Sequence, residues 1–122
     1  MTPKAQRIAI AEACGWTWES RKHPAPCWHK GDFFTGAALF AESRCREDYC
    51  DDLPDYLNDL NAMHEAEKML TEEQRELFRS ILVDVVRGTV DRLRITWQAA
   101  LCHATAAQRA EAFLRTLGLW KD

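Results

Sequence analysis

The stretch Leu53–Leu70, LPDYLNDLNAMHEAEKML, carries much of the information about the fold of this chain. Its apolar residues recur at the spacing of an α-helix, with acidic residues and a lysine around the other side. We expect this helix to begin near Pro54, because proline suits the first position of a helix. The residues predicted to lie on its apolar side are Tyr56, Leu57, Leu60, Met63 and Leu70.

A second amphipathic helix is predicted in the tail Ala104–Trp120, ATAAQRAEAFLRTLGLW. Thr105 and Gln108 have the spacing of a capping box, which predicts the start of the helix. Gly118 followed by an apolar residue is typical of a Schellman motif, which predicts its end. The residues expected to be buried are Ala106, Ala110, Phe113, Leu114 and Leu117.

Two further helices are predicted from their caps and their apolar periodicity. Thr2 and Pro3 suit the start of a helix that ends at Gly15, with Ile8, Ala11 and Cys14 as its buried stripe. A capping box at residues 71–74 predicts the start of another helix, which ends near Gly88. Six apolar residues at i, i+1, i+4, i+5, i+8 and i+9 predict that this helix is buried: Leu77, Phe78, Ile81, Leu82, Val85 and Val86.

Short strands are predicted where apolar and polar residues alternate. Residues 16–19 have this pattern, and residues 93–98 have it again, in a strand that we extend as far as Cys102. A further strand is predicted over residues 27–29, followed by a turn at residues 30–32 that leads to Phe33 and Phe34. Residues 35–52 have no clear period and are interpreted as a loop. The predicted fold is a single α+β domain over residues 1–122, with about four helices packed on a small sheet of roughly three short strands, in a sandwich-like arrangement.

The composition indicates an ordinary folded domain. The chain has 122 residues, of which 47% are hydrophobic and 29% charged. It has no apolar run of the roughly 20 residues that a membrane span needs, and its first residues do not resemble a signal peptide. Five cysteines at irregular spacings suit free thiols better than a disulfide framework. We therefore expect a cytoplasmic protein without a membrane partner.

The charge is unevenly distributed along the chain. Residues 42–76 contain twelve Asp and Glu against four Lys and Arg, a net charge of −8, whereas the other residues contain seven against twelve, a net charge of +5. An acidic surface argues against a nucleic-acid partner and favours a protein with a basic surface. The predicted partner-binding residues combine acidic groups with two aromatic ones: Asp48, Tyr49, Asp51, Asp52, Asp55, Tyr56 and Asp59.

Two sets of residues are candidates for a metal or small-ligand site. The first contains His23, Cys27, His29, Cys45 and Cys50, but their spacing matches no familiar zinc module, and we predict no structural zinc. The second is Asn61 and His64, which flank the predicted apolar stripe. We expect them to be partly buried and held by hydrogen bonds near the sheet or the tail helix. Ligand binding by these two residues is the alternative.

No catalytic constellation is found. Cys102 and His103 are adjacent, so on a strand they would point to opposite sides, and Cys14 at a helix C-terminus would have a disfavoured thiolate. We therefore predict no enzymatic activity and no cofactor. In the tail, Glu111 and Arg115 have the spacing of a surface ion pair, and Arg109 is interpreted as a scaffold residue that reaches the acidic helix.

Two segments resemble a known family. DLNAMHEAEK (59–68) and QRAEAFLRTLG (108–118) are similar to the α/β/α (ABA) sandwich domain of small phage and prophage proteins whose function is unassigned, and GWTWES (15–20) resembles the tryptophan-bearing strand of such proteins. The resemblance covers the two stretches 53–70 and 104–120, which are 35 of the 122 residues, and residues 35–52 depart from the family pattern. It implies a fold, a phage or prophage context and no metal site.

The leading functional hypothesis is a non-enzymatic accessory protein of a phage or prophage that binds a host or phage macromolecule. Inhibition of a host defence or regulatory protein would be one form of this function. A small-ligand or metal-binding domain is the first alternative, and a structural homo-oligomer is the second.

Overall fold

The computed structural model of the protein describes residues 1–19, 27–31, 33–34, 46–89 and 96–122. These ranges contain five α-helices, one 3-10 helix and three strands, so the predicted α+β class is confirmed. In chain order the elements are α1 (Pro3–Ala13), β1 (Thr17–Glu19), β2 (Cys27–Lys30), β3 (Phe33–Phe34), η1 (Arg46–Asp52), α2 (Leu60–Glu67), α3 (Glu72–Thr89), α4 (Trp97–His103) and α5 (Ala106–Thr116).

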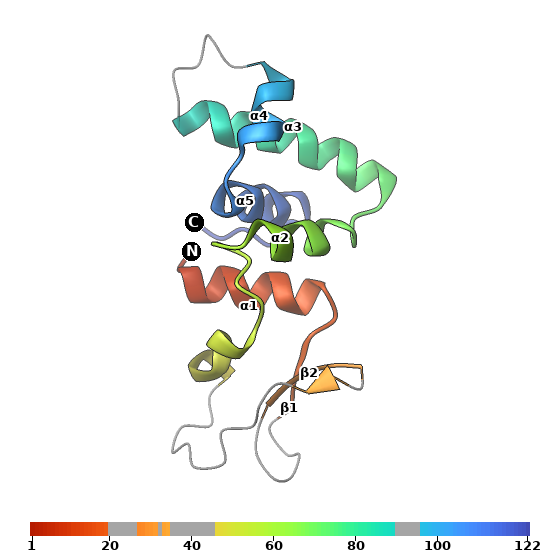
Figure 1. The fold of residues 1–122 in the computed structure, drawn as a ribbon, viewed down its shortest axis with the longest axis vertical. Coiled ribbons are helices and arrows are strands. Elements are labelled where there is room, and N and C mark those ends of the chain that lie inside the picture. The colour runs from red at the N-terminus through yellow and green to blue at the C-terminus, as the bar shows by residue number, and fades with distance from the viewer. Residues whose placement is uncertain (20–26, 32, 35–45, 90–95) are drawn as a thin grey trace.

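The helices are stacked along the long axis of the molecule, and the sheet lies at one end of the stack (Figure 1). Helices α3 and α4 lie at the other end, and α5 is in the middle, where it contacts α1, α2 and α3. The sheet is antiparallel with the order β1-β2-β3, and Trp18 lies opposite Trp28 in its register. It is joined to the helices through η1, which contacts both α1 and β2.

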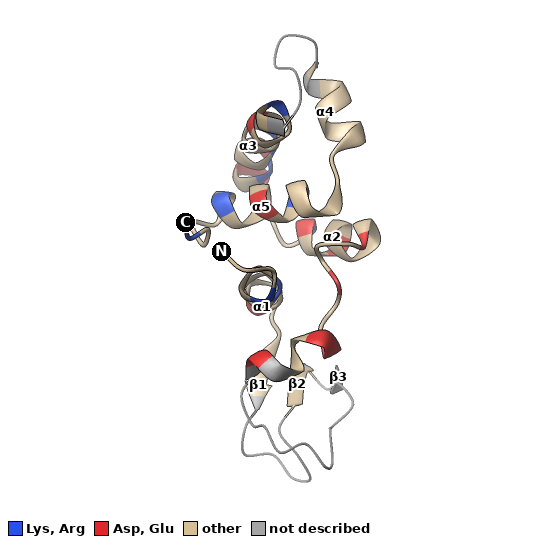
Figure 2. Cartoon of the chain, turned by 90° about the vertical axis from the view of Figure 1, so that its left-hand side faces the viewer, with Lys and Arg blue, Asp and Glu red and all other residues tan. Residues whose placement is uncertain are grey.

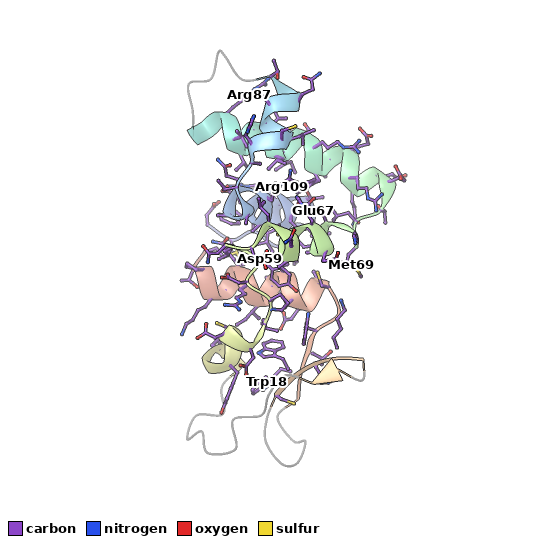
Figure 3. The ribbon with its side chains drawn as sticks, in the orientation of Figure 1. Trp18, Asp59, Glu67, Met69, Arg87 and Arg109 are labelled. Carbon is purple, nitrogen blue, oxygen red and sulfur yellow. The ribbon has the colours of Figure 1, made fainter. Side chains whose placement is uncertain are left out.

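The hydrophobic core runs from α3 to the sheet. Phe113 and Leu114 of α5 are fully buried, and so are Leu82 of α3 and Met63 of α2. At the sheet end an aromatic cluster continues this core (Figure 3): Trp18 packs edge-on against the fully buried Trp28, with 5.5 Å between ring centroids. Aromatic groups in this edge-to-face arrangement add stability beyond their buried area.

Three predicted helix starts are confirmed, and so are the helix ends predicted at Gly15, near Gly88 and at Gly118. The Thr2 hydroxyl accepts a hydrogen bond from the Ala5 amide at 3.2 Å. Reciprocal capping-box bonds join Thr71 with Gln74 and Thr105 with Gln108, at 2.9 and 3.2 Å in each pair. At the end of α5, Gly118 has a φ of 71° and the amide of the next residue donates to the Leu114 carbonyl at 2.8 Å, as in a Schellman motif.

Helix α2 begins six residues later than predicted. The N-cap is Asp59, whose carboxylate accepts from the Asn61 amide at 2.9 Å, and residues 54–59 form turns before it. In these turns the carbonyls of Leu53 and Pro54 accept hydrogen bonds from the side chain of Arg7. In this register Leu60 is exposed, so its predicted place on the buried side is wrong, whereas Tyr56, Met63 and Leu70 are buried.

Helix α3 is less deeply buried than its periodicity predicted. Phe78, Leu82 and Val86, spaced by four residues, are buried against its neighbours. The residues one position earlier lie at the edge of this face: Ile81 and Val85 are partly buried, and Leu77 is 50% exposed. The predicted width of the apolar face is therefore wrong, because α4 and α5 cover only one side of α3.

The strand predicted over residues 93–98 and extended to Cys102 is wrong where the structure describes it, because residues 97–103 form α4. The Thr96 hydroxyl caps this helix by accepting from the Ala99 amide at 3.2 Å. Residues 46–52, predicted to belong to a loop, form η1, and residues 35–45 and 93–95 lie outside the described part of the chain. No helix in the described ranges is both long enough and apolar enough to cross a membrane.

Candidate protein-binding surface

The predicted partner-binding residues fall in one continuous segment, residues 47–59, which we call the acidic segment. It contains six Asp and Glu and no Lys or Arg. It covers nearly all of η1, continues through the turns that follow and ends at Asp59, the N-cap of α2 (Figure 2). Asp51, Asp52 and Asp59 are exposed and Asp55 is half-buried. The structure thus brings these four carboxylates to one stretch of surface; the side chain of Asp48 lies outside the described residues.

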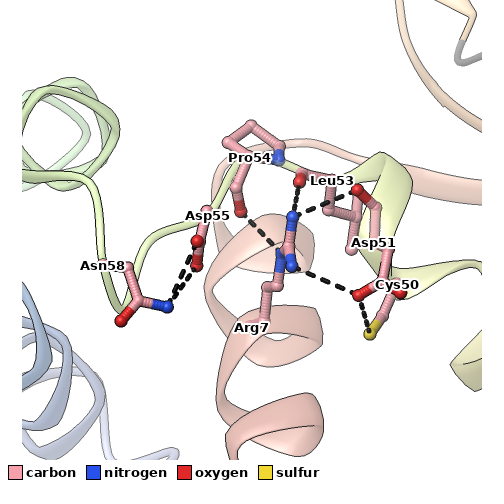
Figure 4. A network of polar contacts seen from close by, with 7 residues as sticks. All are labelled: Arg7, Cys50, Asp51, Leu53, Pro54, Asp55 and Asn58. Atoms are coloured by element: carbon pink, nitrogen blue, oxygen red, sulfur yellow. Dashed lines mark hydrogen bonds and ion pairs between the residues drawn. The ribbon is translucent and has the colours of Figure 1, made fainter.

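Arg7 of α1 holds the acidic segment in place (Figure 4). Its Nε donates to the Pro54 carbonyl at 2.9 Å, and its Nη2 donates to the carbonyls of Leu53 and Asp51, the latter at 3.2 Å. Its Nη1 lies 3.5 Å from the Asp51 carboxylate. The Arg7 side chain is only 15% exposed, whereas that of Asp51 is 89% exposed. The guanidinium therefore fixes the backbone and leaves the carboxylate facing solvent.

Two further carboxylates of the segment have local structural roles. Asp55 accepts hydrogen bonds from the Asn58 side-chain amide at 3.1 and 3.2 Å, which closes the turn before α2. Asp59 caps α2, where a negative charge is favoured by the helix dipole. Asp51 and Asp52 are then the described carboxylates of the segment that remain most available to a partner, since their side chains are exposed on η1.

Tyr49 and Tyr56 do not have the exposed positions that a binding hot spot needs, so this part of the prediction is wrong. Both rings are buried. Tyr49 stacks on Trp18 with 5.3 Å between ring centroids, as part of the aromatic cluster at the sheet. Tyr56 packs beside Cys14, and burial, more than the nearby thiol, raises the pKa of its phenol well above the usual range. Both tyrosines therefore anchor the segment to the core.

The expected burial of Asn61 and His64 is also wrong. Both residues are exposed on α2, because the later start of this helix turns them away from the core. The Asn61 backbone amide takes part in the cap of α2, through Asp59. Ligand binding by these two side chains stays a prediction. It assumed that both side chains are partly buried, and both are exposed.

The residues of the predicted His/Cys cluster are only partly described. Cys27 and Cys50 are buried and His29 is half-buried, whereas His23 and Cys45 lie outside the described residues. Within the described ranges, no three His, Cys, Asp or Glu side chains are grouped closely enough to hold a metal ion. The absence of a structural zinc therefore stays a prediction.

The cysteines considered for catalysis lie in different surroundings. Burial, the largest influence, raises the pKa of the Cys14 thiol above its usual value despite the opposing charge of Lys30 and a hydrogen bond with Tyr56. A protonated thiol is a poor nucleophile. Cys102 and His103 are both exposed on α4, so the prediction that a strand points them to opposite sides is wrong. Adjacent residues of a helix do not face each other either.

The predicted scaffold role of Arg109 is confirmed. Its Nη1 lies 3.0 and 3.2 Å from the two carboxylate oxygens of Glu67, and its Nη2 donates to the Leu101 carbonyl. One side chain of α5 thus links α2 with α4 (Figure 3). The predicted surface pair of Glu111 and Arg115 is also present, with 2.8 Å between charged atoms.

Sequence reasoning missed Arg7, which organises the acidic segment. The sequence did contain a relevant pattern, because Arg7 directly precedes the buried Ile8 on a largely apolar helix. A cation beside a buried face needs acceptors nearby. Its acceptors are backbone carbonyls more than forty residues away, which no pattern of side chains identifies.

Comparisons with known proteins give no relative: no family model, no curated protein and no solved structure matches the chain. The resemblance to phage and prophage ABA sandwich domains therefore stays a prediction based on the two segments quoted above.

Proposed function

We propose that this protein is a non-enzymatic accessory protein of a phage or prophage that acts in the bacterial cytoplasm by binding a host or phage macromolecule. The proposed partner is a protein with a basic surface, and inhibition of a host defence or regulatory protein is one form that the function can take. The observation that carries the proposal is the acidic segment, whose backbone Arg7 fixes while Asp51 and Asp52 face solvent.

A segment held in one conformation is well suited to binding. A flexible loop must be ordered when a partner binds, and the entropy lost in that step weakens the complex. The hydrogen bonds of Arg7, together with the buried Tyr49 and Tyr56, order the segment before binding. Its exposed carboxylates would then attract a basic surface and speed association. Added salt weakens this attraction, because the Debye length is about 10 Å at 0.1 M and shrinks as the salt concentration rises.

Capture from bacterial lysate, with the partner identified by mass spectrometry, is the first test. Its comparison variant is Asp51→Lys with Asp52→Lys, which reverses two charges of the acidic segment. The matched control is Glu73→Lys with Asp84→Lys, which reverses two exposed charges on α3. We expect the control to retain the partner and the acidic-segment variant to lose it. Equal retention by both variants would contradict the proposed surface.

A third variant separates charge from order. Arg7→Met leaves every carboxylate of the segment in place but removes the donors that fix its backbone. We expect binding about tenfold weaker, equivalent to about 1.4 kcal/mol of ordering cost. Association should still slow as salt is added, because every carboxylate of the segment is retained. Unchanged affinity would show that order of the segment is irrelevant to binding.

A further inference from the structure

A small cavity between α2, α3, α4 and α5 combines apolar walls with arginine side chains. Its volume is about 250 Å³. The walls are formed by Leu70, Phe78 and Leu101, of which the first two are buried. The charged side chains that line it are Glu67, Arg75, Arg79 and Arg109.

Arginines outnumber carboxylates on the lining of the cavity. Three arginines and one carboxylate line it, and the glutamates that pair with Arg75 and Arg79 lie outside the lining. Glu67 is already used by Arg109, at 3.0 Å. The Arg109 guanidinium also has an unused donor: its Nε is enclosed, and no residue in the described part of the chain accepts a hydrogen bond from it. An enclosed cationic donor without an acceptor is costly unless an anion or water completes it.

The other two arginines are available to a ligand. Arg75 and Arg79 are one turn apart on α3, so they lie on the same side of that helix. Each is paired with a carboxylate of its own helix, Arg75 with Glu72 at 3.6 Å and Arg79 with Glu76 at 3.1 Å. Both pairs are largely exposed, and exposed pairs contribute little, so an anion in the cavity can replace them.

We propose that this cavity binds a phosphate monoester. The ester carries close to two negative charges at neutral pH, which suits a lining with three guanidinium groups and one carboxylate. Guanidinium groups donate pairs of hydrogen bonds to phosphate oxygens, and here they come from two helices. The apolar walls accommodate the small organic group attached to the phosphate. The cavity is distinct from the acidic segment, because α2, α3, α4 and α5 form it whereas the segment lies on η1 and the turns before α2.

Phenyl phosphate is the probe for this site, because its ring suits a wall that contains Phe78. The ester is titrated into the protein to about 10 mM while backbone amide signals are followed by NMR, a range that covers a Kd of about 1 mM. We expect saturable shifts at Leu70, Phe78 and Leu101. Benzyl alcohol, which has a ring but no charge, should produce none.

The variants Arg75→Gln and Arg79→Gln test the recognition of the phosphate. Both side chains are exposed enough for the fold to be retained. We expect each substitution to weaken binding by about tenfold, the usual effect of removing a charged hydrogen-bond donor. Arg115→Gln is the matched control, since Arg115 is an arginine of α5 paired with a glutamate one turn earlier but does not line the cavity.

The outcomes are distinct. Saturable binding that both cavity variants weaken and the control retains supports the proposal. No saturation at about 10 mM, or equal weakening in Arg115→Gln, would overturn it, the latter because attraction by overall charge would be sufficient. A short peptide with one phosphotyrosine distinguishes two sources of the ester: tighter binding than phenyl phosphate indicates a phosphorylated side chain, and weaker binding indicates a free phosphate ester.

Discussion

Replacing Arg109 with Met should destabilise the protein by about 3 kcal/mol, because it leaves Glu67 without its partner. The two side chains are 12% and 19% exposed, so the pair is mostly removed from water. Breaking a buried ion pair by removing one member costs about 3–5 kcal/mol. We expect the lower end of this range, since water still reaches both groups. The lost hydrogen bond to the Leu101 carbonyl contributes in the same direction.

Removing the other member should cost less. Glu67→Gln keeps an acceptor of nearly the same shape beside the guanidinium and is expected to cost about 1–2 kcal/mol. The double variant should cost less than the sum of the two, with a coupling energy of about 1–3 kcal/mol. The control is Arg115→Met, which breaks the more exposed pair with Glu111 and should cost under about 1 kcal/mol.

Urea unfolding followed by circular dichroism measures these differences as shifts of the midpoint. The comparison requires equal slopes among the variants, because a changed slope means a changed unfolded or folded state. A cost for Arg109→Met that equals the cost for Arg115→Met, or a coupling energy of zero, would refute the reasoning. The link between α2, α4 and α5 would then be no stronger than an ordinary surface contact.

Three further results are expected. Leu82→Ala should cost about 2–5 kcal/mol in urea unfolding, since Leu82 is fully buried. Leu77→Ala, five residues earlier and half-exposed, should cost under about 1 kcal/mol, and equal costs would contradict the register of α3. In the native protein, maleimide should label the exposed Cys102 and should not label the buried Cys14 until urea is added. Peptide mapping by mass spectrometry measures the labelling of each thiol, and labelling of Cys14 in the native protein would contradict its burial. The free energy of unfolding should fall as the pH rises above 9, because burial raises the pKa values of Cys14 and Tyr56 above the 9.0 and 10.0 of the unfolded chain, and the unfolded state therefore loses its protons first. Tyr56→Phe should make this fall shallower above pH 10 by up to about 1.4 kcal/mol per pH unit. An unchanged slope would contradict the role of Tyr56.

The parts of the fold that depend on neighbouring residues could be predicted from the sequence. The caps at Thr2, Thr71 and Thr105 join residues three positions apart, so the pattern of residues contains the whole interaction. The same is true of Gly118, whose positive φ closes α5. The strand at residues 16–19 was predicted from its alternation, and the strand at residues 27–29 because prolines precede it and a turn follows it. The structure has these strands at Thr17–Glu19 and Cys27–Lys30.

The errors arise where distant residues decide the local structure. A helix from Pro54 is plausible from propensity alone, but residues 54–59 form turns, and the Pro54 carbonyl accepts from the distant Arg7 side chain. The alternation of residues 93–98 was too short to separate a strand from a helix, and α4 is favoured by its Thr96 cap and by the burial of Ala100. Propensity is easily overridden in segments of this length.

The candidate site could be predicted in its charge but not in its exposure. The excess of Asp and Glu over residues 47–59 is a property of the sequence alone. The burial of Tyr49 and Tyr56 follows from packing against Trp18 and Cys14, which are far away in the sequence. The cavity with its arginines was not predicted, since Arg75 and Arg79 each have a carboxylate three residues away that explains them locally.

The central position of α5 has a consequence for how the chain folds during its synthesis. Helix α1 packs against α5, although nearly the whole described chain separates them. At a translation rate of roughly 5–20 residues per second, α1 waits on the order of 5–20 s before the ribosome has made its partner. During this time the apolar side of α1, with Ile8, Ile10 and Ala11, has no α5 to cover it. Synthesis halted before residue 106 would therefore leave a nascent chain that exposes this surface to chaperones and proteases.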